Sequence, residues 1–203
     1  SINEIWKRRI LLLASKGIIF WDYSNHNLDL LLTKLNVKGR LFEIGFQKNL
    51  QRIKMNDNKE VDVLFYGSLN NRREKIINSL LKNNVKVKCL FGVYGKDRDD
   101  WIGKSKIVLN LHYYESKIFE IVRIFYLLTN AIPIVSEVDE NTKLNNNYLK
   151  GIKGSNYEDV EKNILSLLEN EKERKLIGLN GFNIIKKYPQ INFTKSILNS
   201  EIS

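Results

Sequence analysis

The sequence predicts an α/β protein built on a doubly wound parallel sheet. From Val61 onward, short apolar runs rich in β-branched residues alternate with helix-length amphipathic segments. The runs contain few charges, which is typical of parallel strands that helices cover on both faces. Glycine or polar residues follow several of the runs, where turns from strand to helix are expected.

The first 46 residues predict a smaller α/β fragment. We expect a helix over residues 5–16, a strand over 17–24, a helix over 25–36 and a strand over 39–46. Ser24 suits the N-cap of the second helix, and Asn36 can adopt the left-handed conformation that often ends a helix. Residues 47–60 are polar and predict a linker.

The regular alternation begins at Val61. The expected strands are VDVLFY (61–66), VKVKCLF (85–91), KIVLNL (106–111) and IPIVSE (132–137). The expected helices between them cover residues 72–83, 100–105 and 116–130. A brief extended piece is expected over 151–155, followed by amphipathic helices over 157–169 and 171–188. Residues 61–203 therefore predict one Rossmann-like domain.

Composition narrows the class of protein. The chain has 203 residues, 43% of them apolar, enough for one large domain or one domain and part of another. Its longest apolar runs fall short of the roughly 20 residues that a membrane span needs. One cysteine, Cys89, and two separated histidines exclude an intramolecular disulfide and a zinc site made of thiolates. These features predict no metal site and fit a reducing, cytoplasmic compartment.

The formal net charge of +10 favours anionic partners. Nucleic acid, an anionic membrane surface and a phosphate-bearing ligand fit this sign equally. No helix-turn-helix, RRM or zinc motif is visible, which disfavours nucleic acid. Peripheral contact with a membrane through the basic surface stays open, as does an ordinary solvated surface.

The candidate chemistry lies in the loops after the strands, because open α/β sheets bind ligands beyond the carboxyl ends of their strands. Gly67 allows close backbone approach, and Ser68, Arg72 and Arg73 follow where a helix begins, which suits a phosphate. A tight turn with solvated arginines is the alternative. The second loop, with Gly92, Val93 and Tyr94, suits a base or sugar ring lying against the backbone.

The third loop and its helix carry the remaining candidates. Lys117, Glu120 and Arg123 recur every three residues along an otherwise apolar helix, and Glu115 lies just before it. We expect this charged seam to face ligand, with Lys117 and Arg123 toward phosphate and the carboxylates toward ribose or sugar hydroxyls. An exposed ladder of i,i+3 ion pairs is the alternative. His112 is a candidate general base, or a loop histidine packed against aromatic residues.

Three segments carry a resemblance to a known family. DVLFYGSLNNRREKIINSLL, VKCLFGVYG and KIVLNLHYYESKIFEIVRIFYLLTNAIPIVSE resemble the C-terminal, donor-binding half of group 1 glycosyltransferases of the GT-B fold, in the spore-maturation-like branch. The resemblance covers about residues 62–188. Residues 1–50, with a linker to 60, resemble the end of the N-terminal, acceptor-side domain. The resemblance implies a nucleotide-diphosphate sugar as donor substrate and no obligatory cofactor or metal.

The sequence departs from the family pattern at three positions. Members commonly carry two Glu separated by seven residues before a small-residue turn, and here Tyr126 and Ile118 stand in those places. Ala131 stands where the family has glycine. Glu115 and Glu120 can only be offset substitutes for the missing pair.

The sequence therefore predicts a glycosyltransferase of GT-B type, with this chain supplying mainly the donor-binding domain. An N-terminal domain or a partner chain would complete the cleft, and the isolated chain would have low or no activity. The alternative is a catalytically inactive Rossmann-like module whose basic surface binds a partner, nucleic acid or an anionic membrane.

Overall fold

The computed structural model describes residues 3–113, 120–139, 142 and 146–202. The chain forms two compact units. Unit 1 combines Ser1–Gly45 with Pro189–Ser203, and unit 2 is Phe46–Tyr188. Unit 1 is therefore assembled from both ends of the chain, whereas unit 2 is continuous.

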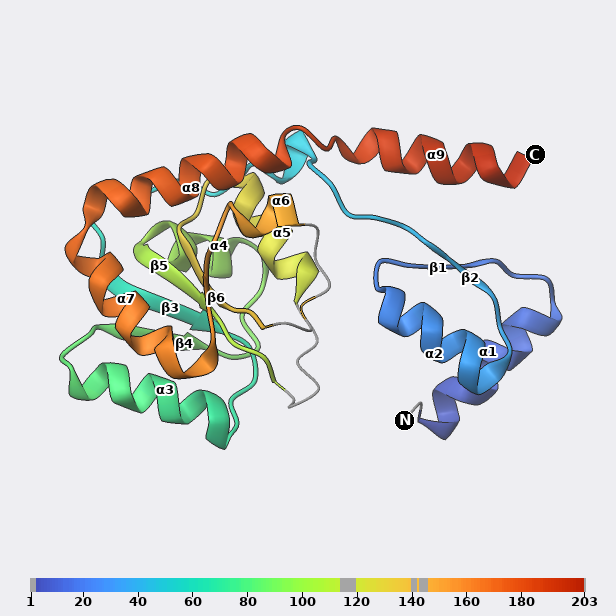
Figure 1. Ribbon diagram of the computed structural model, residues 1–203, viewed down its shortest axis with the longest axis horizontal. Helices are drawn as coiled ribbons and strands as arrows, with labels where there is room; N and C mark the ends of the chain where they lie inside the picture. The colour runs from blue at the N-terminus through green and yellow to red at the C-terminus, as the bar shows by residue number, and fades with distance from the viewer. Residues whose placement is uncertain (1–2, 114–119, 140–141, 143–145, 203) are drawn as a thin grey trace. The chain divides into compact units, whose positions relative to one another are not determined.

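Unit 2 is built on a five-stranded parallel sheet (Figure 1). The strands lie in the order β4 (Val87–Leu90), β3 (Val61–Tyr66), β5 (Ser105–Asn110), β6 (Ile134–Glu137) and β7 (Lys153–Ser155). Each neighbouring pair is parallel, which confirms the predicted parallel sheet. After β4 the chain returns to the other side of β3, so the strand order reverses at β3 and β5.

Helices connect these strands and cover the sheet. They are α3 (Asn71–Lys82), α4 (Gly95–Gly103), α5 (Ile121–Thr129), α6 (Asn146–Leu149), α7 (Val160–Glu169) and α8 (Glu171–Ile185), with short 3-10 turns η1 (Lys48–Leu50) and η2 (Tyr157–Asp159). Successive residues of β3 show the two covered faces. Phe65 lies under an arginine of α3, and Tyr66 contacts arginines of α4 and α5.

The expected helix over residues 116–130 differs from the structure at its start. In the described part of the chain α5 begins at Ile121, and Glu120 is the residue before it, with φ −83° and ψ 68°. The expectation that Glu120 is part of the helix was therefore wrong, although its carboxylate does pair with Arg123 three residues on. The same carboxylate also forms a tertiary ion pair with Arg73 at the end of the sheet.

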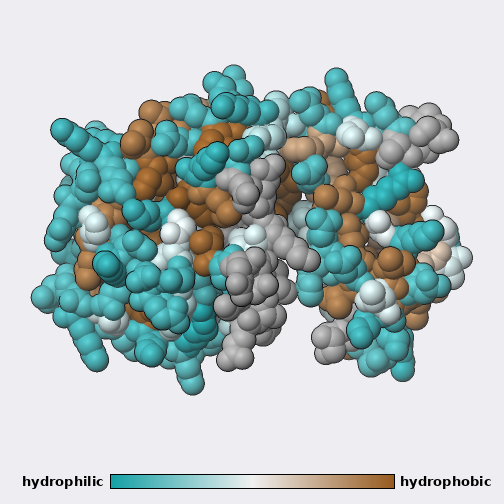
Figure 2. All heavy atoms as spheres, in the orientation of Figure 1, coloured by the Kyte–Doolittle hydropathy of each residue, from teal (hydrophilic) through white to brown (hydrophobic). Residues whose placement is uncertain are grey.

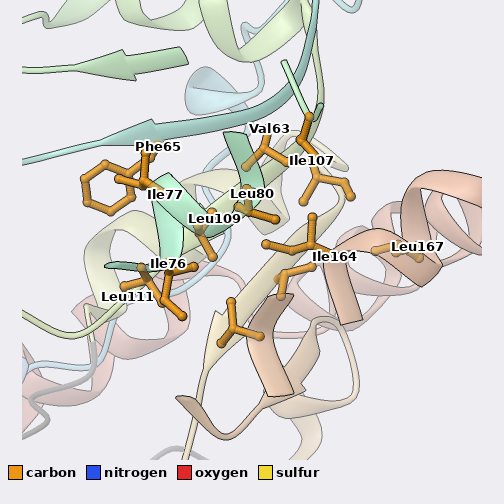
Figure 3. Packing of buried hydrophobic residues seen from close by; sticks show 13 residues of the cluster. Val63, Phe65, Ile76, Ile77, Leu80, Ile107, Leu109, Leu111, Ile164 and Leu167 are labelled. Carbon is orange, nitrogen blue, oxygen red and sulfur yellow. The ribbon is translucent and has the colours of Figure 1, made fainter. Parts of the chain in front are cut away.

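The core of unit 2 lies between the sheet and the helices α3 and α7 (Figure 3). Its fully buried side chains alternate along the two central strands and meet apolar residues of both helices. The labelled members are Val63, Phe65, Ile107, Leu109, Leu111, Ile76, Ile77, Leu80, Ile164 and Leu167. This packing fixes the strand ends against which the polar site is built.

Two glycines hold α8 close to the rest of unit 2. A Cβ on Gly181 would lie 2.6 Å from Leu128 Cδ2 and 2.8 Å from the Gly151 carbonyl oxygen. A Cβ on Gly178 would overlap the Ala131 carbonyl group. Ala131 itself has φ +56°, a left-handed conformation that favours glycine, the residue that the sequence resemblance leads one to expect at this place.

Residues 47–60, which the sequence predicts as a linker, lie with unit 2. The backbone N–H groups of Arg52 and Ile53 both donate to Asn130 Oδ1 at 2.9 Å, and Asn130 Nδ2 donates to Leu50 O at 2.9 Å. One buried asparagine at the end of α5 thus fixes the segment without regular secondary structure. No helix in the described residues is long and apolar enough to cross a membrane.

Unit 1 contains a two-stranded parallel sheet and three helices. The elements are α1 (Glu4–Ser15), β1 (Phe20–Asp22), α2 (Asn25–Leu35), β2 (Gly39–Leu41) and α9 (Gln190–Ile202). The predicted caps of α2 are confirmed, since Ser24 Oγ accepts from the Asn27 N–H and Asn36 has φ +52°. The helix α9 was not predicted. Several large apolar side chains of this unit are exposed (Figure 2), including Trp6 (59%) and Ile19 (53%).

Candidate functional site

The candidate site lies at the carboxyl ends of β3, β5 and β6, where the strand order reverses. Gly67 follows β3 with φ +136°, a conformation that favours glycine. The next helix, α3, is capped by Asn70, whose Oδ1 accepts from the Arg73 N–H at 3.0 Å. Asn70 Nδ2 also donates to the Tyr113 carbonyl at 2.7 Å, so the cap ties the loop after β5 to the start of α3.

Arg73 is the centre of the site and is almost fully buried, with 2% of its surface exposed. Its guanidinium donates to Ser68 O at 2.8 Å, to His112 O at 3.3 Å and to Leu111 O. A further N–H donates to Glu120 Oε1 at 2.6 Å. Backbone carbonyls after two neighbouring strands therefore hold this cation in place.

Glu120 bridges two arginines. Its second carboxylate oxygen accepts from Arg123 Nη1, and the same Nη1 donates to Asn110 Oδ1 at 2.8 Å. Asn110 in turn donates from Nδ2 to Ser136 Oγ at 3.0 Å. The network therefore runs along the ends of β5 and β6 to the first turn of α5.

Gly67 lies against both guanidinium groups of this network. A Cβ there would be 3.1 Å from Arg123 Nη2 and 3.6 Å from Arg73 Nη1. The absence of a side chain allows two cations to converge on the end of β3. Their mutual repulsion is offset by the single carboxylate of Glu120.

Arg72 forms a separate ion pair. Its Nη1 donates to Glu137 Oε2 at 2.7 Å and its Nη2 donates to Glu137 Oε1, while its guanidinium carbon lies 3.8 Å from the centre of the Tyr157 ring. Glu137 is 1% exposed and also accepts from the His112 backbone N–H at 3.0 Å. This bidentate pair holds the end of β6 against the start of α3.

A second arginine pair shares a carboxylate on the face of the sheet that carries Tyr66, which Arg123 also contacts. Asp99 of α4 accepts from Arg52 Nε at 3.0 Å and from Arg98 Nη2 at 2.8 Å. Arg98 also lies 4.8 Å from the centre of the Tyr126 ring and 5.7 Å from that of Tyr66. Across these three groups of ion pairs, five described arginines share three described carboxylates, an excess of positive charge among these side chains.

Burial shifts the pKa of two groups in this region. It raises the pKa of the Tyr66 hydroxyl far above its ordinary value, because the neutral phenol is favoured away from water. It lowers the pKa of the Arg73 guanidinium, and the charge of Glu120 opposes that shift. Tyr66 is therefore a neutral donor and Arg73 a cation at neutral pH.

The structure brings six of the predicted site residues together. They are Gly67, Ser68, Arg72, His112, Glu120 and Arg123. The loop with Gly92, Val93 and Tyr94 follows the edge strand β4, and Tyr94 is 77% exposed. Glu115 and Lys117 lie outside the described residues.

Sequence reasoning missed several residues of the network. It noted Arg73 only as the second arginine at the start of a helix, and it did not single out Glu137, Asn110 or Tyr157, which also make contacts that hold the site together. Glu137 ends a predicted strand and Asn110 is the last residue but one of another, positions that could have marked them. No sequence pattern around Tyr157 indicates a role in the site, because its hydroxyl donates to the backbone carbonyl of Arg72, 85 positions earlier in the chain. The described residues contain no group of three or more His, Cys, Asp or Glu side chains placed to hold a metal ion.

No protein-family model matches the chain. Among curated proteins, it is 34% identical over 128 residues to uncharacterized protein L138 of Acanthamoeba polyphaga mimivirus. It is 27% identical over 138 residues to uncharacterized protein L137 of the same virus. These matches cover 57% and 59% of this chain but only 14% and 19% of the two relatives.

Among solved structures, the chain is similar to TarM, with a TM-score of 0.60 and 14% identity over 95% of this chain and 45% of TarM. It is similar to the sucrose-phosphate synthase of Thermosynechococcus elongatus, with a TM-score of 0.59 and 11% identity over 91% and 58% of the two chains. A glycosyltransferase from Rickettsia africae matches with a TM-score of 0.54 and 12% identity, over 98% of this chain and 66% of the Rickettsia chain.

These structural neighbours are GT-B glycosyltransferases. The likeness bears on the fold, since the sequence identities are low. It confirms the fold that the sequence resemblance predicts. The chain has the Rossmann-like fold of GT-B glycosyltransferases.

Proposed function

We propose that the chain supplies the donor-binding domain of a glycosyltransferase that uses a nucleotide-diphosphate sugar. The observation that carries the proposal is the convergence of Arg73 and Arg123 on Gly67 at the end of β3. Guanidinium groups that keep contacts with neutral acceptors as well as with Glu120, beside a glycine and the start of a helix, form a favourable seat for phosphate oxygens. An excess of arginines over carboxylates supports an anionic ligand.

The proposal assigns roles to the predicted residues. Gly67, Ser68 and Arg123 lie on the diphosphate side, with Arg72 holding Glu137 and the end of β6 in position. The exposed loop of Gly92, Val93 and Tyr94 would contact the base. Glu115 and Lys117 are proposed as further contacts to sugar, ribose or phosphate.

The proposed chemistry needs no obligatory metal or cofactor. Arginines and the start of α3 would stabilise the charge that develops on the departing diphosphate, a stabilisation that is largest where the donors are fixed in advance. His112 and Glu120 remain candidates for a catalytic role. We place the enzyme in the cytoplasm, in the spore-maturation-like branch, with an N-terminal domain or partner chain completing the cleft for an acceptor.

The proposal is tested by a thermal-shift screen against UDP, GDP, CDP, ADP and their common sugars at moderate salt. A ligand that binds only the folded state, at about one hundred times its dissociation constant, adds roughly 2.7 kcal/mol. The site variant Arg123→Gln should lose this shift. Lys175→Gln removes a charge from an exposed pair on α8 and should keep it. No shift with any nucleotide would refute the proposal.

The alternative is an inactive module that binds a polyanion or an anionic membrane through its basic surface. The engagement of Arg72 by Glu137 and the presence of Tyr126 in place of a family Glu favour it. The dependence of binding affinity on salt concentration distinguishes the two functions. Polyanion binding should weaken by about a thousandfold or more between 50 and 200 mM salt when six or more phosphates are contacted, whereas a single sugar-nucleotide site should weaken far less.

A further inference from the structure

The Glu120 carboxylate lies between the two guanidinium groups that converge on Gly67. Its Oε1 is 2.6 Å from Arg73 Nη2, and its Oε2 accepts from Arg123 Nη1. Each oxygen therefore takes one cation, in the way that two oxygens of a phosphoryl group would. Neither arginine depends on Glu120 alone, since Arg73 also binds three carbonyls and Arg123 also binds Asn110.

The exposed fractions of the three side chains show that Glu120 covers the two arginines. The side chain of Arg73 is 2% exposed, that of Arg123 is 14% exposed, and that of Glu120 is 25% exposed. Glu120 precedes α5, so its side chain can turn toward solvent without breaking a turn of the helix. Such a rotation would uncover N–H groups of both arginines while their other contacts hold them in place.

Two further donors lie on the Tyr66 face of β3, which Arg123 contacts, whereas Arg73 lies over Phe65. Arg123 Nε and Tyr66 Oη are buried and have no hydrogen-bond partner among the described residues. The Arg123 guanidinium carbon lies 4.7 Å from the centre of the Tyr66 ring. Buried donors without an acceptor cost free energy, so an anion with several oxygens could bind here where a single carboxylate leaves donors unused.

We propose that Glu120 is an internal competitor that occupies the seat of a phosphoryl group and is displaced by the diphosphate of the ligand. The inference rests on the proposed function. It means that Glu120 lowers the affinity of the proposed site for its diphosphate ligand. Affinity for the diphosphate is then the difference between two anions competing for the same arginines. Removal of the Glu120 charge should tighten binding, although Glu120 itself belongs to the site.

The test is isothermal titration of the full chain with inorganic diphosphate, UDP and GDP at one fixed salt concentration. Glu120→Gln should bind inorganic diphosphate about tenfold tighter than the original chain, which corresponds to 1.4 kcal/mol. Glu173→Gln is the matched control, because it removes one carboxylate that pairs with Lys153 away from the site. It should leave the dissociation constant unchanged. Combining Glu120→Gln with Arg123→Gln should abolish the gain.

A second variant keeps the inference testable if Glu120→Gln does not fold. Glu120→Asp keeps the charge, but its shorter side chain cannot bridge both arginines, so it should tighten binding by a smaller factor. Equal or weaker binding by Glu120→Gln, or by Glu120→Asp where only that variant folds, would overturn the competitor role. The proposed function would survive that result if the original chain binds nucleotide. If no form of the chain binds a nucleotide or inorganic diphosphate, both proposals fail.

Discussion

Gly181→Ala tests the close packing of α8 against unit 2. Alanine in an open helix position is about 1 kcal/mol more stable than glycine. Here the new Cβ would be 2.6 Å from Leu128 Cδ2 and 2.8 Å from Gly151 O, whereas ordinary contact begins at 3.4 Å. The helix must shift by roughly 0.6–0.8 Å, and overpacking of this kind costs about 1–3 kcal/mol. We therefore expect the free energy of unfolding to fall by roughly 1–3 kcal/mol, opposite in sign to the helix propensity.

The assay is urea denaturation followed by tryptophan fluorescence. Of the three tryptophans, Trp6 and Trp21 belong to unit 1 and Trp101 to unit 2. Both unit 1 tryptophans are exposed, so Trp6→Phe and Trp21→Phe give a background in which Trp101 reports the unfolding of unit 2 alone. A lower midpoint with an unchanged slope identifies a true loss of stability.

Asn180→Ala is the matched control for Gly181→Ala. Asn180 is the preceding residue of α8 and is exposed, so alanine there should add a few tenths of a kcal/mol through helix propensity alone, on the order of 0.5. If Gly181→Ala were also stabilising, by about 1 kcal/mol, the close approach of α8 to Gly151 would be wrong.

Three further predictions concern stability. Ala131→Gly should raise the free energy of unfolding by roughly 0.5–1 kcal/mol, because φ +56° strains an L-residue; a decrease in a urea titration would contradict this. Burial alone would raise the pKa of Asp62, but hydrogen bonds from Lys106 Nζ and a backbone N–H lower it overall, so its stabilisation is present above about pH 4 and lost as pH falls. Asp62→Asn should therefore flatten the acid limb of a stability–pH curve, and an unchanged limb would count against this pair. Arg72→Ala leaves the buried Glu137 carboxylate unpaired and should cost about 3–5 kcal/mol in the same urea assay; a loss under 1 kcal/mol would show that the pair is not structural.

The sheet was predictable because its strands are nearly continuous apolar runs. Such runs need burial on both faces, and only a parallel sheet between helices provides it. The caps of α2 were predictable for a local reason, since Ser24 and Asn36 act on backbone groups within a few residues. Both signals lie within a short stretch of sequence.

The site was predictable only in part, because its contacts are long-range. The sequence pointed to the loop that holds Gly67 and to the helix that holds Arg123, but it assigned Glu120 to a helical face. The ion pair of Glu120 with Arg73 joins residues 47 positions apart, and no local pattern encodes it. The helix α9 was missed for a related reason. Its one described buried apolar side chain is Ile197, which lines a hollow together with Arg40 and Leu41 from a distant part of the chain.

The assembly of unit 1 from both ends of the chain sets an order of events during synthesis. The segment Ser1–Gly45 leaves the ribosome before unit 2, but α9, which belongs with it, is made only after Tyr188. At about 5–20 residues per second, the first segment waits roughly ten seconds or more for this helix. Unit 2 can therefore complete its fold on the ribosome, whereas unit 1 can do so only after the end of α9 has emerged.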